Sequence, residues 1–137
     1  MVDRNIILAR VTTIRESVRR LVALAALSER AFRADADACA IAERHLQVAI
    51  QSVIDIGNHV VADLDLGTAT DYKEIFVLLA KHRIISKALA AKLGAMAGMR
   101  NVLVHDYLKV DRGLVHDTLR HDLGDFERFI GAVMKLV

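Results

Sequence analysis

The strongest constraint on the fold is a pair of long apolar stripes in a chain that contains no proline. In the first stripe, apolar residues recur at alternating steps of four and three, at Ile7, Val11, Ile14, Val18, Leu21 and Ala25. The second stripe follows the same steps, at Ala42, Leu46, Ala49, Val53, Ile56 and Val60, and is widened by Ile50, Ile54 and Val61. These steps place each set on one face of an α-helix. With only seven glycines as well, the chain lacks the turn residues that a sheet protein of this size would need.

We therefore predict an all-α fold: an antiparallel up-and-down helical bundle of about five helices. The first helix is expected over about 3–27, and the second from the polar break 28–37 to about 64. The third is expected over about 72–82, the fourth from about 86, and the fifth from about 112 to the C-terminus. The last helix carries an inward stripe of Leu119, Leu123, Phe126, Ile130 and Val133. Asp3 and Asp71 are candidate N-caps. The length of 137 residues fits a single domain over 1–137.

The composition narrows the class of protein further. The formal net charge is only +2, which by itself neither implies nor excludes binding to nucleic acid. A single cysteine, Cys39, allows no intrachain disulfide and is expected to be a small buried filler. No apolar run is long enough to span a membrane, so we expect a soluble cytoplasmic protein with no membrane partner. Because no Gly-rich phosphate loop is present, we expect no nucleotide cofactor.

The stretch "MRNVLVHDY", residues 99–107, departs from this apolar pattern. Leu89, Leu93 and Met96 are followed at the same steps by Arg100 and then Leu103, so an arginine occupies an inward position. An unpaired buried guanidinium is costly. Arg100 is therefore expected either to meet a carboxylate or to lie where the helix opens onto a cleft or an interface.

Three residues of this stretch form a set suited to handling phosphate. Arg100 offers a rigid fork of donors for phosphate oxygens, and His105 can move a proton near neutral pH. Asn101 lies four residues before His105 and shares its helix face, whereas Arg100 and His105 are about 140° apart. One arginine and one histidine are few for an enzyme, but two copies across a dimer axis would supply an acid, a base and charge stabilisation. The competing interpretation is a helix C-terminal cap with a buried salt bridge.

The stretch "RNVLVHDY" is similar to the R-x4-H-x-Y signature of HepT toxins, in the HEPN superfamily of small helical ribonuclease domains. The flanking sequence "LLAKHRIISKALAAKLGAMAGMRNVLVHDYLKVD" also resembles that family. The resemblance implies a homodimer whose motifs meet at a cleft between subunits. It also implies a metal-independent endoribonuclease that acts as the toxin of a type VII-like toxin–antitoxin pair. The partner would be an MntA-like nucleotidyltransferase antitoxin, which transfers AMP to the tyrosine of the motif.

The resemblance implies that Arg100 of this chain holds the scissile phosphate of RNA and that His105 is the general acid/base. It makes Asn101 a polar supporter of the site and Tyr107 the AMP acceptor. An adenylylated Tyr107 would place a bulky anionic nucleotide two residues from His105, where it would repel RNA phosphates.

Other polar residues are weaker candidates. Lys81 and Arg83 could extend a phosphate track toward RNA, although an exposed basic turn is the preferred interpretation. Arg112, His116 and Arg120 share a helix face that we expect to be solvated. The spacing of His116 and His121 fits no strong metal motif, so no metal site is predicted.

Two other functions remain open at the level of sequence. The bundle could be a non-catalytic binding module that partners with, and is modified by, a nucleotidyltransferase. It could also be a scaffold dimer in which Arg100 forms a structural ion pair.

Overall fold

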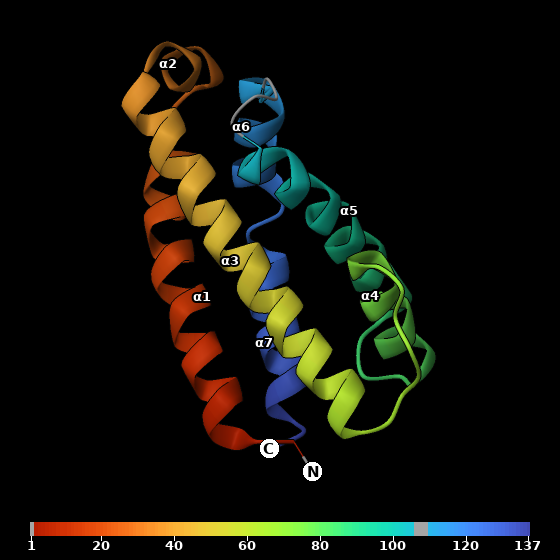
Figure 1. Ribbon diagram of the computed structural model, residues 1–137. Coiled ribbons are helices and arrows are strands. Elements are labelled where there is room, and N and C mark those ends of the chain that lie inside the picture. Colours follow the sequence, from red (N-terminus) through yellow and green to blue (C-terminus); the bar gives the residue numbers. More distant parts are fainter. Residues whose placement is uncertain (1, 106–109) are drawn as a thin grey trace.

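The computed structural model describes residues 2–105 and 110–137, which contain seven helices. The helices are α1 (Arg4–Ala25), α2 (Glu29–Ala34), α3 (Ala36–Asp63), α4 (Tyr72–Lys81), α5 (Lys87–Val104), α6 (Arg112–His121) and α7 (Gly124–Met134). Helix α1 packs along α3, and α4 packs along α5 (Figure 1). The chain runs up α1, down α3, up α5 and down through α6 and α7, which brings the two ends of the chain together (Figure 1). The predicted all-α, antiparallel up-and-down bundle is confirmed. Within the described residues, no helix is long and apolar enough to cross a membrane.

The predicted apolar stripes form the core of the bundle. All nine apolar positions predicted on α3 are buried, as are the five predicted on α6, α7 and the turn between them. On α1 the stripe is buried except at Val18 and Ala25, which are half-buried. The rings of Phe76 and Phe129 meet edge to face at 6.3 Å, which joins α4 to α7 across the core.

Side-chain caps explain where the helices begin. Oδ1 of Asp3 accepts a hydrogen bond from the Asn5 amide at 2.9 Å, and Oδ1 of Asp71 accepts one from the Glu74 amide at 2.8 Å. Such caps satisfy amides of the first turn that have no partner within the helix. Both predicted caps are therefore confirmed.

The polar break predicted over 28–37 is wrong in one respect, because it contains the short helix α2. Phe32 of α2 is fully buried and its ring lies 5.5 Å from that of His116. The imidazole Nε2 of His116 lies 2.7 Å from the carbonyl oxygen of Leu27. His116 is therefore buried beneath α2 and does not lie on the solvated face predicted for it. Cys39 is buried as predicted, and burial raises the pKa of its thiol.

The single helix predicted from 112 to the C-terminus is also wrong, because it breaks after His121 into α6 and α7. Lys92 of α5 reaches into the break and lies 3.1 Å from Asp122 and 2.9 Å from the buried Asp125. These two ion pairs hold the break, and the glycine at position 124 lowers the helix propensity there. The apolar spacing continues across the break, which is why the sequence pattern concealed it.

Candidate functional site

The candidate site lies at the C-terminal end of α5, where the helix stops at His105. His105 is the C-cap residue, and its amide donates to the Val102 carbonyl at 3.3 Å. Its side chain is exposed, whereas that of Arg100 is half-buried. The expectation that the helix ends near His105 is thus confirmed, and the two residues need not share one ideal helix face.

Arg100 is held by a polar relay that begins on α3. Its Nε donates to Oε1 of Gln51 at 2.6 Å, and Nε2 of Gln51 donates to Oδ1 of Asp55 at 2.8 Å. The other carboxylate oxygen of Asp55 lies 3.7 Å from a guanidinium nitrogen of Arg10. Among the described residues, a carboxylate therefore reaches Arg100 only through an amide. Of the two expectations for Arg100, the direct carboxylate partner is not found among the described residues, and a charge-assisted hydrogen bond fixes the guanidinium without neutralising it.

Tyr72, the first residue of α4, supports the same guanidinium from a second direction. The Cζ atom of Arg100 lies 5.4 Å from the centroid of the Tyr72 ring, within the range of a cation–π contact. Neither Tyr72 nor Gln51 was identified from the sequence as part of the site. One signal was present: Gln47, Gln51 and Asp55 recur every four residues and mark a polar edge along the apolar α3.

Asn101 is exposed and lies beside Arg100. A terminal nitrogen of the Arg100 guanidinium, Nη1, lies 3.5 Å from Oδ1 of Asn101, at the outer limit of a hydrogen bond. The contact between Asn101 and the imidazole of His105, expected from their spacing, stays a prediction.

His105 faces an open pocket of about 860 Å³ between α3, α5 and α6, which we call the His105 pocket. It is lined by Arg33, Ala40, Glu43, Arg44, Gln47, Leu103, His105, Val110, Asp111 and Arg112. Arg33 lies 4.0 Å from Asp111 and 3.9 Å from Glu29. Arg44 and Arg112 have no ion-pair partner within the described part of the chain. The pocket therefore combines a histidine with an excess of positive charge.

The polar edge of α3 connects this pocket to Arg100. Gln47 lines the His105 pocket, and Gln51, which holds Arg100, follows one helical turn later, about 6 Å along α3. Arg100 therefore lies against α3 one turn beyond a residue that lines the His105 pocket. A guanidinium that can bind phosphate and an imidazole that can move a proton are suited to a phosphodiester.

Tyr107 lies outside the described residues. The described residues on either side of it, His105 and Val110, both line the His105 pocket.

Lys81 and Arg83 lie at the other end of α5. Arg83 occupies the turn before this helix, with a backbone φ of 60°. Arg100 follows Lys87, the first residue of α5, by thirteen positions, which is about 20 Å along the axis. The structure therefore does not bring these two basic residues together with Arg100 and His105.

The other histidines of α6 are engaged locally. His121 lies 3.0 Å from the Asp117 carboxylate one turn earlier, while His116 is buried beneath α2. Among residues 2–105 and 110–137, no group of three or more metal-ligating side chains is positioned to hold an ion.

Known proteins share this architecture. The model of the HepT-like family, "Ribonuclease HepT-like", matches residues 14–133. The mRNA nuclease HepT of Shewanella oneidensis is 36% identical over 89 residues, which cover 65% of this chain and 67% of that protein. The tRNA nuclease HepT of Aphanizomenon flos-aquae is 32% identical over 90 residues, which cover 66% of this chain and 61% of that protein.

Solved structures match over nearly the full chain. A toxin–antitoxin crystal structure with AMP-PNP has a TM-score of 0.89 at 29% identity, covering 96% of this chain and 99% of that one. The tri-AMPylated HEPN toxin of Shewanella oneidensis, in complex with MNT antitoxin, has a TM-score of 0.88 at 29% identity. That match covers 97% of this chain and 99% of the toxin.

Proposed function

The chain belongs to the HepT-like ribonuclease family, and on this premise we propose that it is the metal-independent endoribonuclease of a toxin–antitoxin pair. The observation that carries the proposal is that Gln51, one turn of α3 beyond Gln47, holds Arg100, while Gln47 and His105 both line a pocket with excess positive charge. The substrate is single-stranded or looped RNA, because its bases and backbone are accessible to side chains. An RNA substrate also implies action in the cytoplasm.

The proposed reaction uses the substrate's own 2′-hydroxyl as the nucleophile. The 2′-oxygen bonds to phosphorus while the bond from phosphorus to the 5′-oxygen breaks, giving a cyclic phosphate and a 5′-hydroxyl. One histidine accepts the 2′ proton and a second proton donor protonates the leaving oxygen. Arg100 stabilises the charge that develops on the phosphoryl oxygens, and Asn101 supports the site from the same helix end. No step requires a metal-bound nucleophile.

A homodimer would supply the second proton donor. Each chain carries one His105 at this site, so an acid and a base acting in one step call for two copies. Val102 and Leu114 are large apolar side chains with 36% and 53% exposure, and both line a shallow apolar groove between α5 and α6. This groove borders the helix end that carries His105 and offers a surface that a second copy can cover.

Regulation by a nucleotidyltransferase antitoxin is the second part of the proposal. The Shewanella relative is AMPylated and bound to its MNT antitoxin. For this chain we propose Tyr107 as the AMP acceptor and an MntA-like enzyme as the partner. An AMP group there would add an anionic phosphodiester beside the His105 pocket and compete with RNA phosphates for its arginines.

Cleavage of single-stranded RNA in EDTA tests the nuclease. Wild type is expected to cleave, and His105→Ala to lose about 10²–10⁴-fold in rate, the usual contribution of a general acid or base. His121→Ala is the matched control, since His121 is exposed and lies on α6. If wild type and His105→Ala are equally inert on varied RNAs, the enzyme proposal fails and a non-catalytic module modified by the antitoxin remains.

Intact mass after co-expression with the cognate nucleotidyltransferase tests the modification. We expect mass added in steps of one AMP on wild type and on Tyr72→Phe, but none on Tyr107→Phe. Tyr72 is the matched control because the chain has only two tyrosines. An unchanged wild-type mass would count against the antitoxin scheme.

A further inference from the structure

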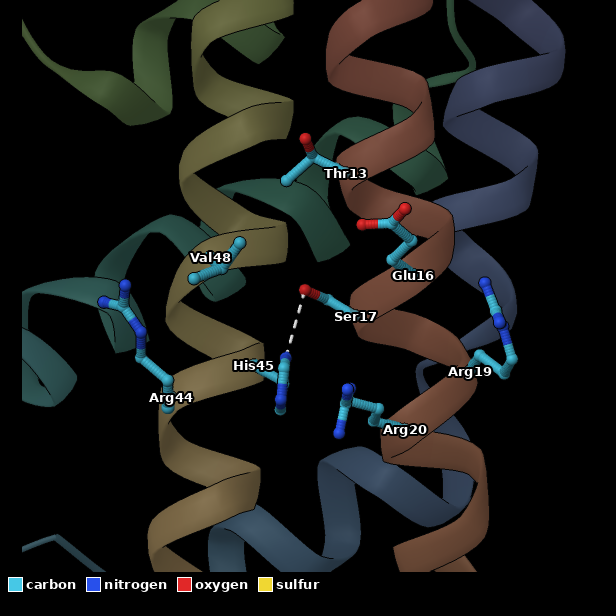
Figure 2. Close-up of a pocket in the computed structure, with 8 residues that line it drawn as sticks. All are labelled: Thr13, Glu16, Ser17, Arg19, Arg20, Arg44, His45 and Val48. Carbon is cyan, nitrogen blue, oxygen red and sulfur yellow. Dashed lines mark hydrogen bonds between the residues drawn. The ribbon is translucent and has the colours of Figure 1, made fainter.

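A second basic pocket lies between α1 and α3 (Figure 2). It has a volume of about 760 Å³, and we call it the Arg20 pocket. Arg19 and Arg20 of α1 and Arg44 and His45 of α3 line it, while Glu16 is its single carboxylate. Its chemistry is therefore that of an anion site.

The arginines of this pocket differ from their neighbours on α1 in having no acidic partner. Arg10 lies 3.7 Å from Asp55, and Arg15 lies 2.8 Å from Glu127. Within the described residues, by contrast, no carboxylate lies at ion-pair distance from Arg19, Arg20 or Arg44. All three side chains are exposed, so among the described residues the positive charge of this pocket exceeds the single negative charge of Glu16.

His45 lies close to one of these charges. Its Nδ1 lies 3.3 Å from the hydroxyl of the buried Ser17, and Figure 2 shows its ring beside the side chain of Arg20. Burial lowers the pKa of the His45 imidazole, and the charges of Arg20 and Arg44 lower it further. Near neutral pH the ring is therefore neutral and serves as a fixed polar group between two cations.

Arg44 connects the two pockets. It lines both the Arg20 pocket and the His105 pocket, and Figure 2 shows its side chain extending from α3 away from His45. An α-helix with its side chains is about 10–12 Å wide. At the rise of about 3.4 Å per nucleotide of a stacked strand in a duplex, about three nucleotides cover that width, and an extended single strand needs fewer. One strand can therefore reach from His105 past Arg44 to Arg20.

We infer that the Arg20 pocket is a second phosphate-binding subsite, which holds the RNA strand a few nucleotides away from the cleaved bond. The inference rests on the proposed ribonuclease function and adds a path for its substrate. RNA is favoured over an acidic protein because the basic surface is continuous, through Arg44, with the pocket that faces His105. Arginine's fork also suits the oxygens of a phosphodiester.

Binding of labelled RNAs of two lengths to the full-length protein tests the inference. In a His105→Ala background, Arg20→Gln should weaken binding of a single strand of about 12 nucleotides, but not of a dinucleotide, whose single phosphodiester can occupy only one of the two pockets. The slope of log affinity against log salt for the longer strand should fall by about 0.7, the value of one phosphate contact on a single strand. Arg20 is exposed and unpaired, so an unchanged melting curve should accompany the loss.

Arg4→Gln is the matched control, because it removes the same charge from the same helix. Arg4 is exposed and lies sixteen residues from Arg20, about 24 Å along α1. If Arg20→Gln and Arg4→Gln bind the longer RNA equally well while wild type still cleaves it, the subsite is refuted and the nuclease stands. If wild type neither binds nor cleaves RNA, both proposals fail. If Arg20→Gln loses only its association with the nucleotidyltransferase, the pocket is a protein interface and the inference is overturned.

Discussion

Replacing Gln51 with alanine should impair RNA cleavage although Gln51 does not touch the substrate. Its Oε1 accepts the 2.6 Å hydrogen bond from Nε of Arg100, and we propose that this bond positions the guanidinium for the scissile phosphate. A hydrogen bond to a charged group is worth about 1.5–3 kcal/mol. Because both residues are half-buried, water can replace part of the bond, and about 1.5 kcal/mol is the appropriate figure. That corresponds to about a tenfold fall in kcat/KM.

The effect on stability should be smaller than the effect on rate. Because water can hydrate the exposed part of Arg100 in Gln51→Ala, the free energy of unfolding should fall by only about 1 kcal/mol or less. For a chain of this size that lowers Tm by a few degrees. Asn58→Ala is the matched control, since Asn58 is an exposed amide on the same helix. It should change neither the rate nor the melting temperature.

A double-mutant cycle shows whether the effect passes through Arg100. In an Arg100→Ala background, Gln51→Ala should cause almost no further loss of cleavage, because its partner is already absent. An equal tenfold loss in both backgrounds would refute the positioning role. A large loss of Tm with an unchanged rate in folded protein would instead favour the scaffold interpretation, in which Arg100 is structural.

The two remaining predictions concern the bundle itself. A Cβ at Gly57 would lie 2.7 Å from Cγ2 of Ile75, so Gly57→Ala should destabilise the fold by about 1–3 kcal/mol in chemical denaturation. Gly131→Ala, whose Cβ would meet nothing within 4 Å, should instead stabilise α7 by about 0.5–1 kcal/mol, and a loss at both positions would contradict this packing. The hydrogen bond to Asp125 raises the pKa of Lys92. The stability that protonated Lys92 adds to the fold is therefore complete below the ordinary lysine pKa of about 10.4, and it is lost as pH rises through the raised pKa. The Tm difference between wild type and Lys92→Met should therefore shrink above that pH, and a constant difference would refute the ion-pair origin.

The helices could be predicted from the sequence where the apolar spacing and the N-cap of one helix are sufficient to define it. The steps from Ile7 to Leu21 identify one face of α1 without knowledge of its neighbours, and Asp3 marks the start of that helix. The break between α6 and α7 has no such signal, because Lys92, which holds it, lies about thirty residues earlier in the chain. A contact between distant parts of the chain decided that boundary, and no local pattern reveals it.

In the candidate site, too, local patterns could be predicted from the sequence, whereas contacts between distant parts of the chain could not. Arg100 stood out because an arginine interrupted an apolar stripe, and the motif around it suggested His105. Gln51 and Tyr72 contact Arg100 from α3 and α4. The spacing of residues along α5 gives no information about side chains on other helices, so these two contacts could not be predicted from it. The roles of the motif residues stay predictions, and Tyr107 lies outside the described residues.

The contacts of Arg100 bear on whether it is a structural or a substrate-binding residue. A guanidinium has five N–H donors in a planar fork. Gln51 takes the donor on Nε, and Asn101 meets one on Nη1 at only 3.5 Å, while Cζ lies over the Tyr72 ring at 5.4 Å from its centroid. Among the described residues, the hydrogen bonds thus engage Nε and one donor of Nη1, so most donors of the outer nitrogens are left for phosphate oxygens. Being held by the bundle and binding a phosphate are therefore compatible, because fixing the Nε edge aims the outer nitrogens without consuming them.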